Sequence, residues 1–303
     1  MQDLLIRAGC FVGIILLGFI LRRTGFFNEH AFGVLSKVVL KITFPASIIF
    51  SFASMEVSAS MLTIAVISFA CGLMYMGIGY LSHLRRPKNE QAFAVLNLPG
   101  YNIGIFTVPF VQSFLGPVGM VATSIFDIGN AFICLGGAYG VASAMKAGKA
   151  FDVKRIGKAL LSSLPFMCYI VMILVNLLKI TVPSPVLQFA EILKNANAFL
   201  AMLMIGVGFQ IKADKEKIGK LVKFVVLRYL IAIPVALIFY FALPFALEIR
   251  QTLVVLAFSP VGSAVPAFTG ELKEDVGLSS AINSVCIVVS IVIMVTLLSV
   301  MLV

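Results

Sequence analysis

Apolar stretches of similar length recur along the whole chain, and short polar connections separate them. A helix that spans a bilayer needs about 20 predominantly apolar residues, and about ten stretches meet that requirement. Their approximate limits are 4–22, 34–55, 60–83, 91–114, 117–145, 156–179, 187–211, 221–244, 251–270 and 277–302. The pattern predicts an all-α membrane protein with about ten transmembrane helices.

The composition agrees with a chain whose main solvent is lipid. Hydrophobic residues make up 61% of the 303 positions and charged residues only 12%, whereas a soluble domain carries about 25% charged residues. The net charge of +10 could suggest nucleic acid, but the basic residues form short clusters between the apolar stretches. We therefore expect the lipid bilayer, and no nucleic acid, as a partner.

The distribution of lysine and arginine predicts the orientation in the membrane. Most of them fall in the odd-numbered connections, including Arg22, Arg23, Arg85, Arg86, Lys146, Lys149, Lys154, Arg155, Lys212, Lys215 and Lys217. Arg7, Lys179, Lys194 and Arg250 lie on the opposite side. Because basic connections stay in the cytoplasm, we predict a multi-pass protein of the cell's inner (plasma) membrane with both termini outside.

The order of the stretches predicts two related halves. A division in the basic connection assigns five stretches to residues 1–150 and five to 151–303, and an odd number per half makes the halves inverted. QAFAVLNLPGYN from Gln91 resembles QTLVVLAFSPVGS from Gln251, which sets the fourth stretch opposite the ninth. The two ranges are expected to form two inverted five-helix repeats of one membrane domain.

Proline and glycine interrupt the fourth and ninth stretches. The candidate substrate-binding residues there are Pro99, Gly100, Tyr101, Asn102, Pro260, Gly262 and Ser263. Both residue types weaken a helix, and unwound backbone at that depth must be buried in protein or line a cavity. The N-termini of half-helices would then carry positive partial charge toward an anionic substrate. The alternative is a pair of proline kinks with packing roles only.

Few polar side chains capable of charge or strong hydrogen bonding lie inside the apolar stretches. Asp127, with Asn130 on the same helix face, can carry a proton, help to bind sodium, pair with a buried cation or make a structural hydrogen bond. Arg228 can reach the interface, bind a carboxylate substrate or neutralise Asp127. Asn283 joins the candidate site because an unpaired amide is costly in lipid.

Several segments resemble a known family. They are GFILRRTGFFNEHAFGVLSKVVLKITFPASIIFSF near the start, NIGIFTVPF from Asn102, MLMIGVGFQI from Met202 and SPVGSAVPAFTGELKEDVGLSSAINSV from Ser259. The chain resembles the auxin efflux carrier family, whose bacterial members are often described as malate or malonate permeases. The family pattern N-T-G-F-x-G-x-P is kept at Asn102, Gly104 and Pro109, whereas Ile103 and Phe106 depart from it.

This resemblance implies a fold similar to bile acid/sodium symporters, with helices 4 and 9 crossing at their breaks. It further implies a scaffold of helices 1, 2, 6 and 7 and a mobile transport unit of helices 3–5 and 8–10. Family members are thought to move their substrate by an elevator-like shift and to form homodimers through the scaffold. By the same resemblance, Pro99 to Asn102 and Pro260 to Ser263 would contact the substrate.

The function expected from these features is secondary transport, or facilitated movement, of small organic anions. Carboxylates such as malate or malonate and auxin-like acids are the candidate cargo, with no cofactor and with possible proton or sodium coupling. A membrane sensor that binds its ligand without transport is the alternative. Enzymatic activity is not expected, because His30 and His83 lie in connections, Asp127 has no second carboxylate beside it, and no phosphate-binding loop is present.

Overall fold

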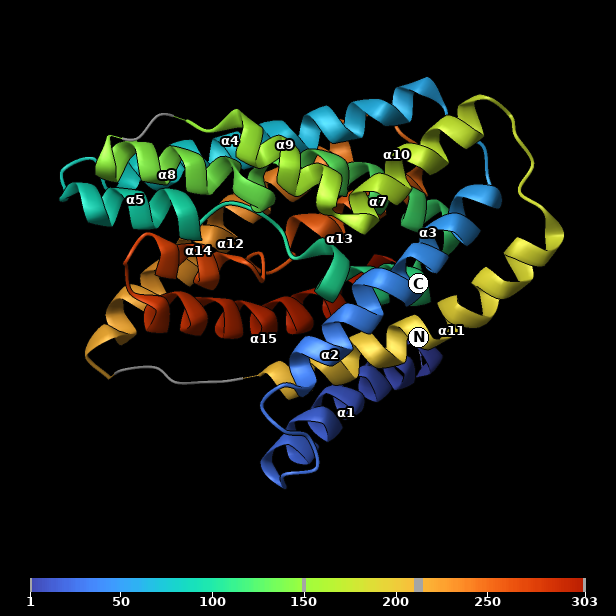
Figure 1. Cartoon of the computed structure of the whole chain (residues 1–303), viewed down its shortest axis with the longest axis horizontal. Helices are drawn as coiled ribbons and strands as arrows, with labels where there is room; N and C mark the ends of the chain where they lie inside the picture. Colours follow the sequence, from blue (N-terminus) through green and yellow to red (C-terminus); the bar gives the residue numbers. More distant parts are fainter. Residues whose placement is uncertain (1, 149–150, 210–214, 302–303) are drawn as a thin grey trace.

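The computed structural model describes residues 2–148, 151–209 and 215–301, and helices dominate this part of the chain (Figure 1). In chain order they are α1 (Gln2–Arg23), α2 (Ala31–Val38), α3 (Phe44–Ala53), α4 (Thr63–Ser82), α5 (Lys88–Asn97), α6 (Val108–Phe114), α7 (Gly116–Phe132), α8 (Ala138–Ala147), α9 (Val153–Ser162), α10 (Leu164–Leu177), α11 (Ser184–Gly208), α12 (Ile218–Phe241), α13 (Leu247–Ala257), α14 (Val265–Glu271) and α15 (Val276–Met301). Those ranges contain no β-strand. Lys149 and Lys212, which contribute to the predicted orientation, lie outside the described residues.

In the described part of the chain, six helical segments are long and apolar enough to cross a membrane, or seven if a bent pair counts as one span. The six are Ala31–Ala53, Ala59–Ser82, Gly116–Lys146, Ser184–Gly208, Ile218–Phe241 and Val276–Met301. The structure therefore confirms an all-helical chain with several spans. The full set of ten and its division into two repeats stay predictions.

One predicted span is wrong in its shape. The stretch 156–179 was expected to be a single helix, but α9 and α10 meet at an angle of 76° around Ser163. Pro165 favours the bend, because it lies in the first turn of α10, where its missing N–H and fixed φ are tolerated. Ser163 itself has the extended backbone that suits the boundary between two helices.

Both predicted interruptions are present. The first helix of each pair ends early, α5 at Asn97 and α13 at Ala257, and non-helical backbone follows. The chain resumes through the π-helical turn Ile103–Thr107 into α6, and directly into α14. Gly100 has φ of +79°, a conformation that favours glycine. Pro109 and Pro266 lie in the first turns of the resumed helices.

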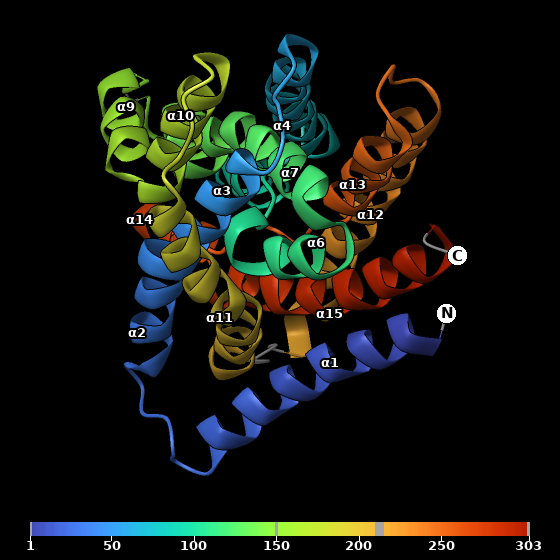
Figure 2. The same ribbon diagram turned by 90° about the vertical axis from the view of Figure 1, so that its right-hand side faces the viewer.

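Close helix packing fixes the outer part of the molecule. Figure 2 shows α1, α2 and α11 on one side, with α4, α12 and α13 across the molecule from them. The α1–α11 contact depends on Gly18 and Gly206, because a Cβ at either position would collide with a backbone carbonyl oxygen of the partner helix. Elsewhere α10 packs on α3, and α4 packs on α7 at Gly129, where a Cβ would collide with the carbonyl oxygen of Ala65.

Candidate functional site

The two helix interruptions touch each other in the interior. The backbone N–H of Asn102 donates to the carbonyl oxygen of Pro260 at 2.9 Å. The hydroxyl groups of Thr107 and Ser259 lie 2.7 Å apart, and both side chains are fully buried. These contacts join the first half of the chain to the second half at the place where each lacks a regular helix. We refer to residues 98–102 and 258–264 as the crossover.

Arg228 on α12 holds the crossover from one side. Its guanidinium donates to the carbonyl oxygens of Leu98 (2.5 Å), Gly100 (2.7 Å) and Ser259 (2.8 Å). The residue is 2% exposed. The guanidinium lies in the interior and forms no ion pair with Asp127 among the described residues. The predicted roles of Arg228 stay predictions. Its donors are used by backbone carbonyls that follow α5 and α13, which sequence spacing alone does not reveal.

The other side of the crossover carries the N-terminal ends of two helical segments. The turn Ile103–Thr107 and α14 both begin there, and N–H groups in a first helical turn lack the carbonyl one turn earlier. The first N–H of each segment is already used, because Ile103 donates to the Tyr101 carbonyl oxygen and Val265 donates to that of Gly262. Asn102 and Ser263 precede these two starts. The Asn102 side chain is 6% exposed, and none of the hydrogen bonds among the described residues involves its amide group. The residue lines both cavities described below, where a ligand or water can satisfy its amide.

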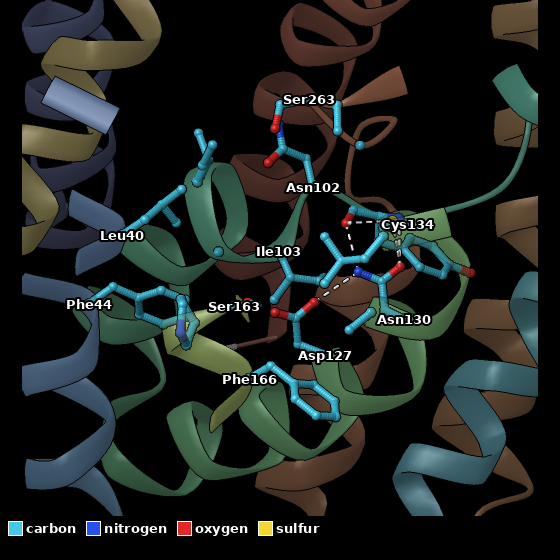
Figure 3. Close-up of a pocket in the computed structure, with 18 of the residues that line it drawn as sticks. Leu40, Phe44, Asn102, Ile103, Asp127, Asn130, Cys134, Ser163, Phe166 and Ser263 are labelled. Carbon is cyan, nitrogen blue, oxygen red and sulfur yellow. Dashed lines mark hydrogen bonds between the residues drawn. The ribbon is translucent and has the colours of Figure 1, made fainter. Parts of the chain in front are cut away.

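A cavity of about 170 Å³, which we call the Asp127 pocket, opens beside these residues. Figure 3 shows Asn102 and Ser263 together at one end, with Asp127 and Asn130 farther along and Leu40 and Phe44 on the opposite wall. The cavity is lined by Leu40, Phe44, Tyr101, Asn102, Ile103, Gly104, Ile105, Asp127, Asn130, Ala131, Cys134, Leu135, Ser163, Pro165, Phe166, Tyr169, Gly262, Ser263, Ala264 and Val265. Its walls are largely apolar, and Asp127 supplies the carboxylate.

Three π-helical turns contribute to that lining. They are Val39–Thr43, Ile103–Thr107 and Ile133–Gly137, and they supply Leu40, Gly104 and Cys134 to the cavity. A π-helical turn widens the hydrogen-bond ring by one residue and is frequent at functional sites. The backbone is thus irregular on three separate segments around one cavity.

Asp127 is held by two donors. Asn130 Nδ2 donates to Oδ1 at 2.8 Å and the Tyr169 hydroxyl donates to Oδ2 at 2.9 Å. Asn130 also bonds the crossover, because its Oδ1 accepts from the N–H of Tyr101 and its Nδ2 donates to the Tyr101 carbonyl oxygen. Asp127 is therefore connected to the first helix break through a single side chain.

A second cavity of about 190 Å³, the Asn283 pocket, lies on the other flank of the crossover. It is lined by Phe32, Asn102, Ile105, Ile205, Gly208, Phe209, Ser263, Pro266, Ser280, Asn283, Ser284 and Ile287. Asn102, Ile105 and Ser263 line both cavities. These three residues form the boundary between two pockets that a bound molecule could occupy together.

The two pockets are related in their polar residues. Asn130 on α7 bonds the first break at Tyr101, and Asn283 on α15 bonds the second break, with Nδ2 3.3 Å from the Gly262 carbonyl oxygen. Three residues before each asparagine stands a further polar side chain, Asp127 in one pocket and Ser280 in the other. Each pocket therefore has an asparagine that bonds a helix break, but only the Asp127 pocket has a carboxylate at the position where the Asn283 pocket has a serine.

The structure brings together most of the residues that the sequence indicated. Tyr101, Asn102, Gly262, Ser263 and Asn283 line one or both pockets. Pro99, Gly100 and Pro260 belong to the crossover but do not line either pocket; the carbonyl oxygens of Gly100 and Pro260 make the crossover hydrogen bonds already described.

Sequence reasoning missed Tyr169, which donates to Asp127 across helices. Ser280 was also not among the candidate site residues. No pattern marks Tyr169, because its position in an apolar stretch is ordinary for a membrane tyrosine. Within the described ranges, no group of three or more His, Cys, Asp or Glu side chains is placed to hold a metal ion.

Comparison with known proteins assigns the chain to a family. Residues 11–156 match the family described as "Membrane transport protein", a range that includes the first helix break, Asp127 and Asn130. No curated protein matches the chain significantly. With the six long apolar helical segments of its described residues, the protein is a multi-pass membrane protein. The chain belongs to the auxin efflux carrier family of membrane transport proteins.

Proposed function

We propose that this protein is a secondary carrier of small organic anions, and that a carboxylate group of the substrate binds at the crossover beside Asn102 and Ser263. The observation that carries the proposal is the unpartnered amide of Asn102, which is 6% exposed and lines both pockets. An amide offers two N–H donors, and a carboxylate oxygen is a suitable acceptor for one of them.

The polarity of the crossover favours an anion over a cation. The C-terminal ends of α5 and α13 carry negative partial charge, and the Arg228 guanidinium donates hydrogen bonds to the carbonyl oxygens that follow them. The N-terminal ends of Ile103–Thr107 and α14 carry positive partial charge and begin next to Asn102 and Ser263. Such ends bind anions through their free N–H groups. A carboxylate at this point would accept from the Asn102 amide and from the N–H groups of these first turns other than those of Ile103 and Val265, which donate to crossover carbonyls.

The size and lining of the pockets favour a small substrate with an apolar or weakly polar body. Cavities of about 170 and 190 Å³ leave room for a few carbon atoms on either side of the boundary. Leu40, Phe44 and Phe166 give the Asp127 pocket an apolar wall. Short carboxylates such as malate and malonate, and auxin-like acids, are the cargo that we propose.

Helix packing supports two inverted repeats of five spans. If residues 1–150 and 151–303 are equivalent halves, α1 corresponds to α9 and α10, while α2 and α3 correspond to α11. Exchange of the halves then converts the α1–α11 contact into the α10–α3 contact, and both contacts are present. The paired breaks and the paired amides Asn130 and Asn283 fit the same exchange. We therefore propose the ten-span arrangement similar to bile acid/sodium symporters.

An elevator-type movement is part of the proposal. Here the third to fifth and eighth to tenth predicted spans (60–145 and 221–302) would move against a scaffold of the first, second, sixth and seventh predicted spans. Among the described residues, the polar contacts across this boundary include Tyr169 to Asp127 and the ion pair of Arg155 on α9 with Glu271 on α14. Gln112 on α6 also bonds Ser47 on α3 and both Asn197 and the Lys194 carbonyl oxygen on α11. These hydrogen bonds would break when the mobile unit shifts. A homodimer through the scaffold, a plasma-membrane location and termini on the outer side complete the proposal.

Asp127 is proposed as the site of proton coupling. A charged carboxylate lining a small pocket disfavours a second negative charge there, since both would share a poorly solvated space. Protonation of Asp127 removes that repulsion, so an anion and a proton would enter the site together. The Tyr169 hydroxyl and the Asn130 amide, which donate to the ionised form, would hold the side chain in place between the two states.

A flux assay with purified protein in liposomes tests the proposed function. Malate, malonate, succinate, lactate and indole-3-acetate would be offered singly, with sodium and pH varied independently on each side. Saturable uptake of at least one acid above protein-free liposomes is expected. Saturable binding with no flux under any gradient would contradict a carrier and favour a sensor.

A further inference from the structure

Arg228 makes an unusual set of contacts for a charged side chain inside an apolar helix. The guanidinium lies 2.5 to 2.8 Å from three carbonyl oxygens, two in the first break and one in the second. No carboxylate forms an ion pair with it among the described residues. The rings of Tyr75 and Tyr101 flank it, each with its centroid 5.4 Å from Cζ. The positive charge is therefore stabilised by backbone oxygens and aromatic faces.

Carbonyl oxygens gathered around one point are a site for a cation. Hard metal ions are commonly bound by backbone carbonyl groups, and discontinuous helices of transporters use unwound carbonyls in this way. Here the oxygens of Leu98, Gly100 and Ser259 converge from two chain segments that repel each other, because both follow helix C-terminal ends. Without a cation between them, the two negative ends would have no compensation.

We propose that Arg228 is a built-in counter-cation that takes the place of a bound metal ion at the crossover. A guanidinium carries a positive charge and offers donors in a rigid fork that fits several acceptors. It closes the carbonyl side of the crossover and thereby presents the N–H side, with Asn102 and Ser263, to the pockets. Arg228 is a positioning residue. Transport by this chain therefore needs no sodium ion at the crossover.

The inference rests on the proposed carrier function for its flux measurements but also has a readout that does not depend on flux. Its first test compares Arg228→Lys with Arg228→Met. Lysine keeps the charge and loses the fork, whereas methionine keeps similar bulk without charge. Uptake should fall roughly 10-fold for Arg228→Lys and roughly 100-fold for Arg228→Met, since hydrogen bonds from charged groups contribute strongly. Equal uptake by Arg228→Met and the parent would overturn the proposal.

A matched control separates charge at the crossover from general loss of an arginine. Arg250 on α13 donates to a single carbonyl oxygen, that of Tyr240, at 2.8 Å and contacts neither break. Arg250→Met should transport within about twofold of the parent. A loss in Arg250→Met as large as that in Arg228→Met would show that the effect is not specific to the carbonyl site and would overturn the proposal.

Chemical rescue provides the second test. Arg228→Ala leaves a space shaped like guanidinium and lined by the three carbonyl oxygens. Guanidinium chloride at millimolar concentration should raise the melting temperature of this variant and restore part of its uptake, whereas urea, a neutral molecule of the same shape, should do neither. If the variant is recovered folded only in guanidinium, the proposal is supported. If guanidinium and urea act alike on folding and melting, the proposal is wrong.

The sodium requirement completes the test. Parent protein should take up its acid at the same rate when sodium is replaced by potassium or choline, and an absolute need for sodium would contradict the proposal. If the parent moves no acid at all, the carrier function fails. The guanidinium-dependent melting of Arg228→Ala still decides the assignment of Arg228, so the two failures are distinguishable.

Discussion

At the scale of single residues, the buried polar groups carry most of the information about function. The sequence identifies Asp127, Asn102 and Arg228 as unusual because each interrupts an apolar context. It does not identify their partners, since hydrogen bonds such as Tyr169 to Asp127 join residues that are far apart in the chain. Arg228 illustrates the limit best, because a carboxylate is the partner one expects from charge and backbone carbonyls are the partners present.

Replacement of Asp127 tests proton coupling at this scale. In Asp127→Asn the side chain no longer exchanges a proton, so uptake should lose its response to an inward proton gradient, whereas the parent should accelerate as the external pH falls. The measurement is initial uptake in liposomes at several external pH values. Tyr169→Phe is the matched control, because it removes one hydrogen bond to Asp127 but leaves the titratable carboxylate. An unchanged pH response in Asp127→Asn would rule out coupling through this residue.

At the scale of helices, hydrophobic length predicts where elements lie, and proline and glycine predict where two of them break. The interruptions around Gly100 and Gly262 follow from residues visible in the sequence. The 76° bend at Ser163 and the π-helical turns do not, because they depend on which neighbour each segment packs against. Local propensity limits these shapes, and tertiary contacts select among them.

The packing of α1 on α11 gives a prediction with an internal control. A methyl group at Gly18 would collide with the carbonyl oxygen of Leu203, whereas one at Gly13 on the same helix meets no atom within 4 Å. Gly18→Ala should destabilise the protein by about 1–3 kcal/mol through overpacking, and Gly13→Ala should be neutral or slightly stabilising. Thermal unfolding in detergent measures both. Equal melting temperatures for the two variants would refute this account of the interface.

The start of α15 provides a prediction about pH. Asp275 accepts a hydrogen bond from the N–H of Leu278 at 2.9 Å, as an N-cap residue does. Partial burial raises the pKa of Asp275, but the Lys217 ammonium, 2.6 Å away, and nearby backbone N–H groups outweigh this effect and hold the pKa below its ordinary value. The carboxylate therefore stabilises the fold above the ordinary aspartate pKa, and this contribution is lost as the pH falls through the pKa in the folded protein.

Asp275→Asn should keep the cap and lose the charge, and its melting temperature should lie below that of the parent at neutral pH. The difference should shrink toward zero in acid. Asp275→Ala, which also loses the cap, should cost about 1 kcal/mol more at neutral pH. Melting curves across an acid titration provide the measurement, and a parent–Asn difference that does not change with pH would contradict the assignment.

At the scale of the whole molecule, two interrupted helices meet at the crossover. The C-terminal ends of α5 and α13 lie on one side of it, and the N-terminal ends of Ile103–Thr107 and α14 lie on the other. Arg228 covers the carbonyl side, and the N–H side opens on two pockets that share Asn102 and Ser263. The sequence predicts the two breaks and their pairing by inverted symmetry. It cannot predict that both pockets meet at one asparagine, because that requires the packing of α7 and α15 on opposite flanks of the crossover.

The most direct test of the account is counterflow of a transported acid in liposomes, with Asn102→Ala compared with the parent. Asn28→Ala serves as control, because Asn28 is exposed and lies outside both pockets. Loss of the two amide donors should reduce exchange roughly 10- to 100-fold, while Asn28→Ala and the melting temperatures of both variants stay close to the parent. Undiminished exchange by a folded Asn102→Ala would contradict substrate binding at the crossover.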